Sequence, residues 1–316
     1  MNICIVGAGA IGSWIAGRLA LAGNDVSLVA RGETLQAIDT EGLRITDGGD
    51  TRCVAVAASD DPERLGAHDV VVIAVKAPAL PDLAPSLRPL VRADTDIIPM
   101  LNGVPWWFTD EPLWSVDPDL QIADALPIEQ IAGCVVHASC FRSAPNHVTI
   151  KHAEKLILGE PGGGSSERID RLCELFQNAG IRSDASDNVR RAIWYKLWGN
   201  ATINPISALT RSTADKLLEE PTLRTLMSEA MDELAAIGAA IDCPISETAE
   251  DRMAVTARLG AFKSSMLQDV EASRPIEVEA LVGAPREIAA RVGVATPRLD
   301  RIYALTRLMG ENLGLL

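Results

Sequence analysis

The chain opens with a short apolar run over residues 2–6, followed by the turn sequence Gly-Ala-Gly-Ala-Ile-Gly and a helical pattern over residues 13–22. Gly23-Asn24 ends the helical pattern, and residues 25–30 form a second β-rich run. Strand, helix and strand over roughly 30 residues make a βαβ unit. The right-handed crossover of such a unit places both strands in one parallel sheet.

Further strand patterns follow along the first half of the chain. Residues 43–46 and 52–57 flank the polar turn Asp-Gly-Gly-Asp and predict a hairpin. The nearly continuous apolar runs 69–75 and 96–101 are typical of strands covered by helices on both faces. An antiparallel meander at the sheet edge is predicted from three segments: residues 133–141, 147–151 and 155–159.

The pattern changes character near Ser186. Residues 167–179 and 181–183 still predict one helix and one strand, whereas everything from Asp187 onward has helical periodicity without strand-like alternation. We therefore predict an α/β protein: a Rossmann-type, doubly wound dinucleotide-binding domain over residues 1–186, followed by an all-α domain over residues 187–316.

Composition narrows the function classes. The 316 residues are 47% hydrophobic, which is ordinary for a globular protein, and the net charge of −14 argues against nucleic acid as the main partner. No basic leader precedes the first strand, and no apolar run approaches the ~20 residues of a membrane span. Six scattered cysteines and four histidines lack metal-ligand spacing, so we expect buried thiols, no metal and a cytoplasmic location.

The glycine turn after the first strand is the first candidate site. Its G-x-G-x-x-G spacing permits a tight turn, close approach of a pyrophosphate and close helix packing. The phosphates would lie on the unpaired N–H groups at the helix N-terminus. The expected contacts are Gly7, Ala8, Gly9, Ala10, Ile11 and Gly12.

The end of the second strand carries Arg31 where NAD-specific sites usually place Asp or Glu. A guanidinium can pair bidentately with a 2′-phosphate, which favours NADP(H) as the cofactor. A solvated surface arginine is the alternative. Lys76 and Asn102 end the next two predicted strands at the carboxyl edge, where open α/β sheets bind ligands, although Asn-Gly is also an ordinary turn sequence.

A polar row lies on an otherwise apolar helix that we predict from Val189 to Asn204, where Pro205 stops or kinks it. Lys196, Asn200 and Asn204 recur every four residues and share one face. Buried polar groups need partners, and a keto-acid pocket would supply them. Hydride delivery to the carbonyl builds alkoxide charge that Lys196 could stabilise and protonate, aided by a pKa lowered by burial. An inter-helix hydrogen-bond network without substrate is the alternative.

A second polar block joins Ser264–Asp269 to Arg274-Pro275-Ile276-Glu277. Pro275 suits the first turn of a helix, so Glu277 could be a capping-box glutamate after an N-cap at Arg274. Arg274 is a poor N-cap residue, which weakens that interpretation.

Together these residues resemble the ketopantoate reductase (2-dehydropantoate 2-reductase) family over nearly the whole chain. The most specific matches are the block from Lys196 to Pro205 and Ser264–Asp269 with Glu277. The resemblance implies an active site in the cleft between a Rossmann domain and a helical domain. It also implies NADPH-dependent reduction of a 2-keto acid, first of all ketopantoate, to the (R)-2-hydroxy acid.

The resemblance further implies residue roles. Lys196 would be the general acid, and Glu277 would contact the substrate hydroxyl and the nicotinamide side. Asn102 would contact both cofactor and substrate. Further contacts are implied for Asn200, Asn204 and Ser265 with the substrate, and for Lys76 and Ser139 with the cofactor.

Two departures bear on the substrate. Ala214 and Phe262 stand where the family often carries asparagines, and Trp106, Trp107 and Phe108 add aromatic bulk, for packing or for substrate contact. A reductase of another 2-keto acid and a non-catalytic NADP(H) sensor are therefore the alternative functions. Apolar helical surface is compatible with a homodimer.

Overall fold

The computed structural model describes residues 1–258 and 260–316, which divide into two compact units. The first unit comprises residues 1–75, 79–101 and 121–189, and the second comprises residues 76–78, 102–120 and 190–316. The last boundary therefore follows Val189, near the position expected at Ser186. Two short segments from the first half of the sequence belong to the second unit, which the sequence pattern did not indicate.

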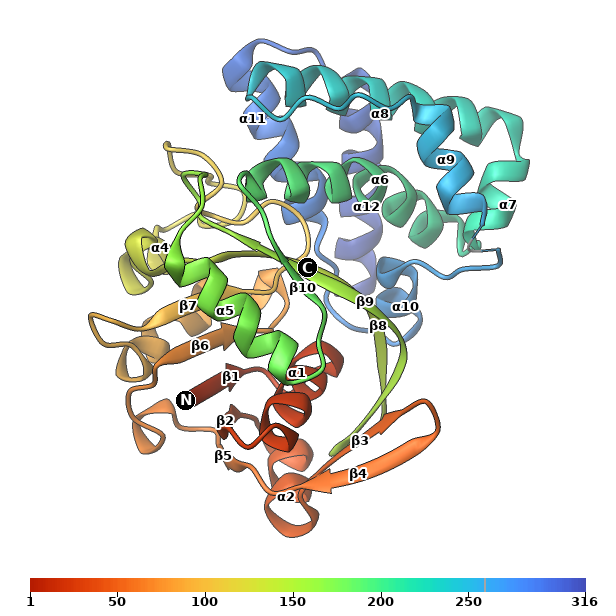
Figure 1. Ribbon diagram of the computed structural model, residues 1–316. Helices are drawn as coiled ribbons and strands as arrows, with labels where there is room; N and C mark the ends of the chain where they lie inside the picture. Colours follow the sequence, from red (N-terminus) through yellow and green to blue (C-terminus); the bar gives the residue numbers. More distant parts are fainter. Residues whose placement is uncertain (259) are drawn as a thin grey trace. The chain divides into compact units, whose positions relative to one another are not determined.

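One of the two sheets of the first unit is a five-stranded parallel sheet (Figure 1). Its strands pair in register, with Val6 of the first strand opposite Val29 on one side and Ile73 on the other. The two strands predicted from continuous apolar runs are buried along their whole length. The strand order is β5 (Ala57–Ser59), β2 (Asp25–Val29), β1 (Asn2–Val6), β6 (Val70–Ile73) and β7 (Asp96–Pro99).

A second sheet lies on the other side of helix α1 (Ala10–Leu21), which contacts strands of both sheets. The hairpin predicted between residues 43 and 57 is present as an antiparallel pair and belongs to this second sheet. The strand order is β10 (Ser183–Ala185), β9 (His147–Gly159), β3 (Leu43–Asp47) and β4 (Asp50–Val54), and β8 (Gly133–Ala144) also pairs with β9.

The predicted three-segment meander is wrong. Residues 133–159 form two long strands, β8 and β9, which pair antiparallel in the second sheet rather than at the edge of the first. The polar residues 151–154, which suggested a turn, continue β9 with their side chains exposed. Three register shifts, after His137, Ser139 and Arg142, absorb the irregular pairing, as β-bulges do.

Helices complete the first unit and cover its sheets. The amphipathic helix α5 packs against β9 and β10, and its N-cap Ser166 accepts from the N–H of Ile169. Four of the six free cysteines are buried as expected, whereas Cys53 is exposed on β4. The helices are α2 (Gly32–Glu41), α3 (Leu80–Leu83), α4 (Gln121–Ala125) and α5 (Glu167–Asn178).

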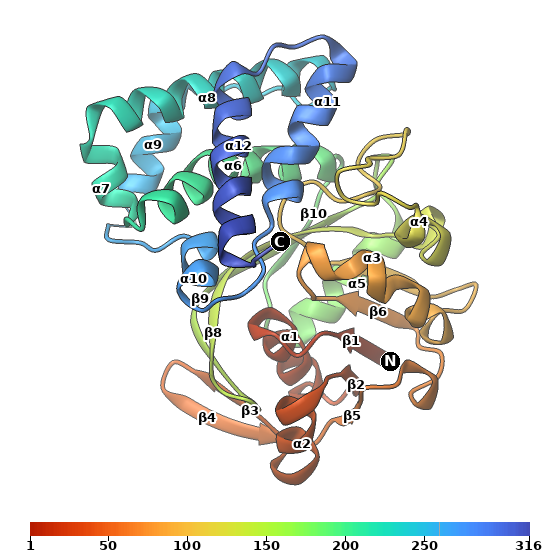
Figure 2. The same ribbon diagram turned by 180° about the vertical axis from the view of Figure 1, so that it is seen from behind.

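Among the described residues of the second unit, the regular secondary structure is helical, and loops such as residues 102–120 connect or flank the helices (Figure 2). Helix α8 (Pro221–Ala240) is the central packing element, because it packs against α7, α9, α11 and α12 and accepts two hydrogen bonds from α6. No helix in the described part of the chain is both long and apolar enough to cross a membrane. The helices are α6 (Val189–Thr210), α7 (Ala214–Glu219), α8 (Pro221–Ala240), α9 (Ala249–Ala257), α10 (Ser265–Glu271), α11 (Ala284–Val292) and α12 (Pro297–Leu313).

Helix α6 is held by its two tryptophans. Trp194 donates from its indole N–H to the carbonyl of Leu234 at 3.0 Å, and Trp198 donates to Met231 at 2.8 Å, so both buried indoles are satisfied by α8. Pro205 does not end α6, which continues to Thr210. Proline removes one intrahelical hydrogen bond, and burial of the surrounding side chains compensates for that loss.

Glycines allow α6 to approach its neighbours closely. A Cβ on Gly238 of α8 would lie 2.5 Å from the indole nitrogen of Trp194, and a Cβ on Gly199 of α6 would lie 2.6 Å from Nε of Arg252. The same guanidinium lies 5.3 Å from the ring centroid of Tyr195. Helix α6 is therefore packed at contact distance on two sides.

Candidate functional site

The glycine turn joins β1 to α1 at the carboxyl end of the parallel sheet. Gly12 is buried, and a Cβ there would overlap the carbonyl oxygen of Gly7. Gly9, the N-cap of α1, has no side-chain cap, and the nearest atom to a Cβ there lies 3.8 Å away. The first N–H groups of α1 have no intrahelical acceptor, so the backbone around Gly9 is accessible to an anion.

Arg31 lies in the same unit, two residues beyond the end of β2. Because β2 pairs in parallel with β1, Arg31 leaves the sheet at the same edge as the glycine turn. Its side chain is exposed. The predicted nicotinamide contact, Ser139, is exposed on β8 opposite His152 in the second sheet.

Lys76 belongs to the second unit, where an ion pair holds it. Its ammonium pairs with the carboxylate of Asp269 and donates to the carbonyl of Pro275 at 2.9 Å. Asp269 is buried and also accepts from Nε of Arg274 at 3.1 Å. The carboxylate of Asp269 therefore pairs with both Lys76 and Arg274. Through Lys76 it is also linked to the carbonyl of Pro275, two residues before Glu277.

Glu277 is the second buried carboxylate of this group, with 8% of the residue exposed. Its Oε1 accepts from the backbone N–H of Ala77 at 3.2 Å, and its Oε2 accepts from the side-chain amide of Asn102 at 3.3 Å. Burial raises the pKa of Glu277, while the charge of Lys76 and these two donors oppose that rise. The structure thus brings Lys76, Asn102 and Glu277 together.

The capping-box interpretation of Glu277 does not fit this geometry. Residues 274–277 are not helical, and the helix begins only at Val278. A π-helical turn, Glu279–Gly283, then leads into α11. The carboxylate of Glu277 is engaged by residues far away in the sequence rather than by its own helix.

The loop after Asn102 packs against this π-helical turn. Val104 donates to the carbonyl of Ala280 at 2.8 Å, and Gly103, with φ of +81°, lies where any Cβ would overlap the same carbonyl. Phe108 stacks on Trp194, with ring centroids 5.8 Å apart. The aromatic residues of the loop are buried, so packing within the second unit accounts for them.

The polar row of α6 lies on an apolar helix, as expected. Lys196 and Asn200 are half-buried and Asn204 is buried, and the large aliphatic and indole side chains from Ile193 to Ile203 on the same helix are at most 7% exposed. Asn204 donates to the hydroxyl of Ser265 at 3.3 Å, so the row meets the start of α10. Ser265 is itself exposed.

The sequence pattern predicts no role for Asp269, although this residue lies within the polar block Ser264–Asp269. The available signal was its position four residues after Ser265 on one short helix, which places both side chains on one face. Its partners Lys76 and Arg274 come from different parts of the chain, so no local pattern identified them.

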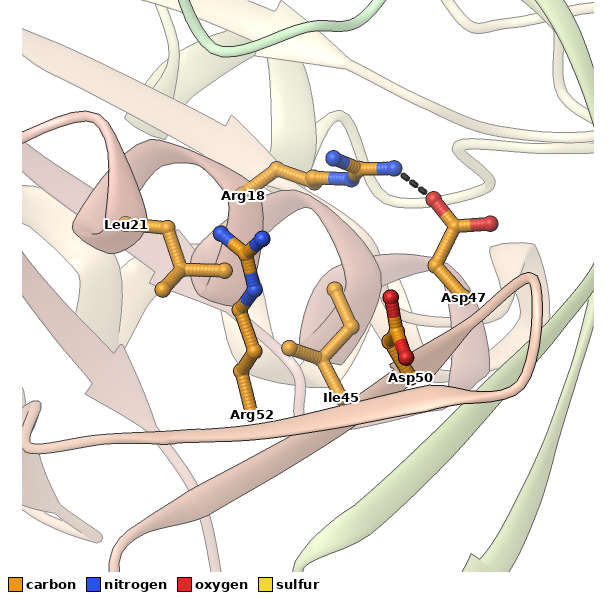
Figure 3. Close-up of a pocket in the computed structure, with 6 residues that line it drawn as sticks. All are labelled: Arg18, Leu21, Ile45, Asp47, Asp50 and Arg52. Atoms are coloured by element: carbon orange, nitrogen blue, oxygen red, sulfur yellow. Dashed lines mark ion pairs between the residues drawn. The ribbon is translucent and has the colours of Figure 1, made fainter.

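A separate hollow of about 220 Å³ lies in the first unit between α1 and the β3–β4 hairpin (Figure 3). Arg18 pairs there with Asp47, while Asp50 and Arg52 line the same space. Because two arginines and two aspartates line this hollow, its side-chain charges cancel and favour neither an anionic nor a cationic ligand. None of the predicted site residues lines it.

Two sequence profiles of one protein family match most of the chain. The family profile described as ketopantoate reductase PanE/ApbA matches residues 3–163, and its C-terminal counterpart matches residues 188–310. A curated 2-dehydropantoate 2-reductase from Mesorhizobium japonicum is 38% identical over 99% of both chains.

Solved structures of related proteins share the fold of this chain. A protein assigned as a ketopantoate reductase from Ralstonia solanacearum MolK2 is 46% identical, with a TM-score of 0.96 over 100% of this chain and 99% of that one. A D-mandelate dehydrogenase, solved with NADH and anilino(oxo)acetate, shares the fold at a TM-score of 0.88 over the full length of both chains, with 22% identity.

Replacing Gly12 with Ala should destabilise the protein by about 1–3 kcal/mol or more, because the added methyl group overlaps backbone rather than a movable side chain. Gly9→Ala is the matched control, since its Cβ meets nothing within 3.8 Å. Urea unfolding measures both. Equal losses of stability would contradict the packing assigned to Gly12.

Gly103→Ala should destabilise the second unit, because it combines a strained positive φ with overlap of the Ala280 carbonyl. Gly48→Ala at the hairpin turn is the control: φ is +58° but the surrounding space is open, so only the backbone strain of about 1 kcal/mol applies. Thermal unfolding should show a clearly larger loss for Gly103→Ala, and a loss no greater than that of the control would disprove the contact.

Proposed function

This chain belongs to the ketopantoate reductase family, and we propose that it is a cytoplasmic NADPH-dependent 2-dehydropantoate 2-reductase that forms (R)-pantoate. The observation that carries the proposal is the row of Lys196, Asn200 and Asn204 on one face of a helix that is otherwise largely apolar and buried. Such a row supports a pocket for a small polar substrate, because buried amine and amide groups gain little from apolar surroundings.

The glycine turn fits a dinucleotide. Gly12 closes the turn against Gly7, while the space at Gly9 leaves the N-terminus of α1 open to a pyrophosphate. Arg31 is proposed to pair with a 2′-phosphate, which favours NADP(H). NADPH, when bound, supplies the hydride that reduces the carbonyl carbon. The other proposed cofactor contacts are Lys76, Asn102, Ser139 and Glu277.

Lys196 is proposed as the general acid. Its ammonium donates a hydrogen bond to the keto oxygen and transfers its proton to that oxygen as the alkoxide forms. Asn200, Asn204 and Ser265 orient the carboxylate and hydroxyl of the substrate. Glu277, whose two oxygens already accept hydrogen bonds from Ala77 and Asn102, accepts from the substrate hydroxyl.

Another small 2-keto acid is the second candidate substrate. Ala214 and Phe262, the two departures from the family pattern, are joined by a hydrogen bond from the N–H of Ala214 to the carbonyl of Phe262 at 2.9 Å. The phenyl group of Phe262 is 37% exposed, three residues before Ser265. An apolar group beside the proposed pocket favours a 2-keto acid with a more apolar substituent than ketopantoate carries.

Purified protein should oxidise NADPH when ketopantoate is added, and Lys196→Ala should lower kcat by about 10²–10⁴-fold, because the general acid is lost. NADPH binding, measured by fluorescence, should be nearly unchanged. Lys216→Ala removes an exposed lysine from the same helical unit and serves as control. A panel of 2-keto acids identifies the substrate, and a fully active Lys196→Ala variant would remove this lysine from the mechanism.

Arg31→Ala should raise the KM for NADPH by about tenfold and leave the KM for NADH unchanged, since only NADPH carries the charge that the guanidinium binds. Arg64→Ala removes another exposed arginine of the first unit and should affect neither cofactor. Steady-state kinetics with both cofactors measure the ratio. Equal use of NADH and NADPH by the unaltered protein would refute the cofactor assignment.

A further inference from the structure

Asp269 is a buried carboxylate that binds two cations from separate segments. Only 8% of its side chain is exposed, and its oxygens meet the ammonium of Lys76 and the guanidinium of Arg274. The backbone N–H of Arg274 also donates to the carbonyl of Asp269 at 2.9 Å. Losing one partner from such a buried pair costs far more than losing an exposed one.

The contacts of Asp269 continue to Glu277 along two short paths. Lys76, held by Asp269, precedes Ala77, whose N–H donates to Glu277 at 3.2 Å. The same ammonium donates to the carbonyl of Pro275, two residues before Glu277. Asp269 therefore holds the segment of Ala77, which donates the hydrogen bond, next to the segment of Glu277, which accepts it, and both belong to the second unit.

We propose that Asp269 is a positioning residue for the reaction: its carboxylate fixes the ammonium of Lys76 so that Glu277 is held in place with a defined balance of charge around it. The inference rests on the proposed function, in which Glu277 contacts the substrate. Asp269 itself touches neither substrate nor cofactor in this role.

The charges that act on Glu277 have opposite signs. Lys76, from the segment after β6, favours the carboxylate form and lowers the pKa of Glu277, whereas Asp269, from α10, raises it. The N–H of Ala77 and the amide of Asn102 also favour the carboxylate. Removing the charge of Asp269 should therefore lower the pKa of Glu277, and removing that of Lys76 should raise it.

Asp269→Asn tests the proposal with little change of shape. Because Glu277 acts as a carboxylate, the acid limb of the kcat/KM profile for the keto acid should move to lower pH by roughly 0.5–1 unit. Lys76→Met should move it the opposite way, even where its kcat/KM is reduced. The alkaline limb is the internal control.

Glu271→Gln is the matched control variant. It removes a negative charge from the same helix, but Glu271 pairs with Lys263 at the surface. Its acid limb should coincide with that of the unaltered protein. If Asp269→Asn also leaves the limb in place, or merely lowers the melting temperature as a structural residue would, the positioning role is disproved.

Carbon-13 NMR titration of the Glu277 carboxyl, assigned with Glu277→Gln, measures the same shift without activity. This separates the two proposals. A protein that reduces no 2-keto acid refutes the proposed function, whereas an unchanged Glu277 titration in Asp269→Asn refutes the role of Asp269 in either case.

Discussion

The burial of helix α6 is the constraint on which the second unit depends. Its two tryptophans are completely enclosed and satisfied only because their indole N–H groups reach carbonyls of α8. A helix fixed in this way cannot rotate to expose its polar row to water without breaking both hydrogen bonds and uncovering its apolar faces. Lys196, Asn200 and Asn204 therefore owe their orientation to residues on the other faces of the same helix.

The second unit also keeps a carboxylate where burial disfavours its charge. Glu277 is stabilised by a backbone N–H, a side-chain amide and a nearby ammonium, which together offset part of its desolvation. Buried carboxylates with opposing influences on their pKa occur more often at functional sites than elsewhere. Burial of the charged Glu277 lowers the stability of the folded protein, and in return its carboxylate is held in a fixed position as a hydrogen-bond acceptor.

Local patterns predicted much of the fold. The alternation of apolar runs and helical stretches identified β1, α1 and β2, and the loss of strand-like alternation after Asp187 identified the helical half. These helices and strands can be predicted because their periodic patterns involve residues that are close together in the sequence. The lengths of β8 and β9 escaped prediction, because the exposed polar residues of β9 are paired by a strand that the local pattern does not reveal.

The sequence allowed candidate site residues to be predicted one by one, but not the contacts between them. Spacing alone put the polar row of α6 on one face, and the glycine turn was evident from its motif. The assignment of residues 76–78 and 102–120 to the second unit was not evident, since it depends on contacts between segments far apart in the chain. The same reason hid the pairing of Lys76 with Asp269.

The close packing at Gly199 and Gly238 limits how this protein can change. A methyl group at Gly199 would displace the guanidinium of Arg252, and one at Gly238 would overlap the carbonyl of Cys243 and the buried indole of Trp194. Attempts to redesign substrate preference can vary the exposed residues Ser265 and Phe262, next to the buried end of the polar row, with little effect on this framework. A larger residue at Gly238 would push α6 and α8 apart, so new specificities are more accessible through the exposed residues than through the helix pair that supports them.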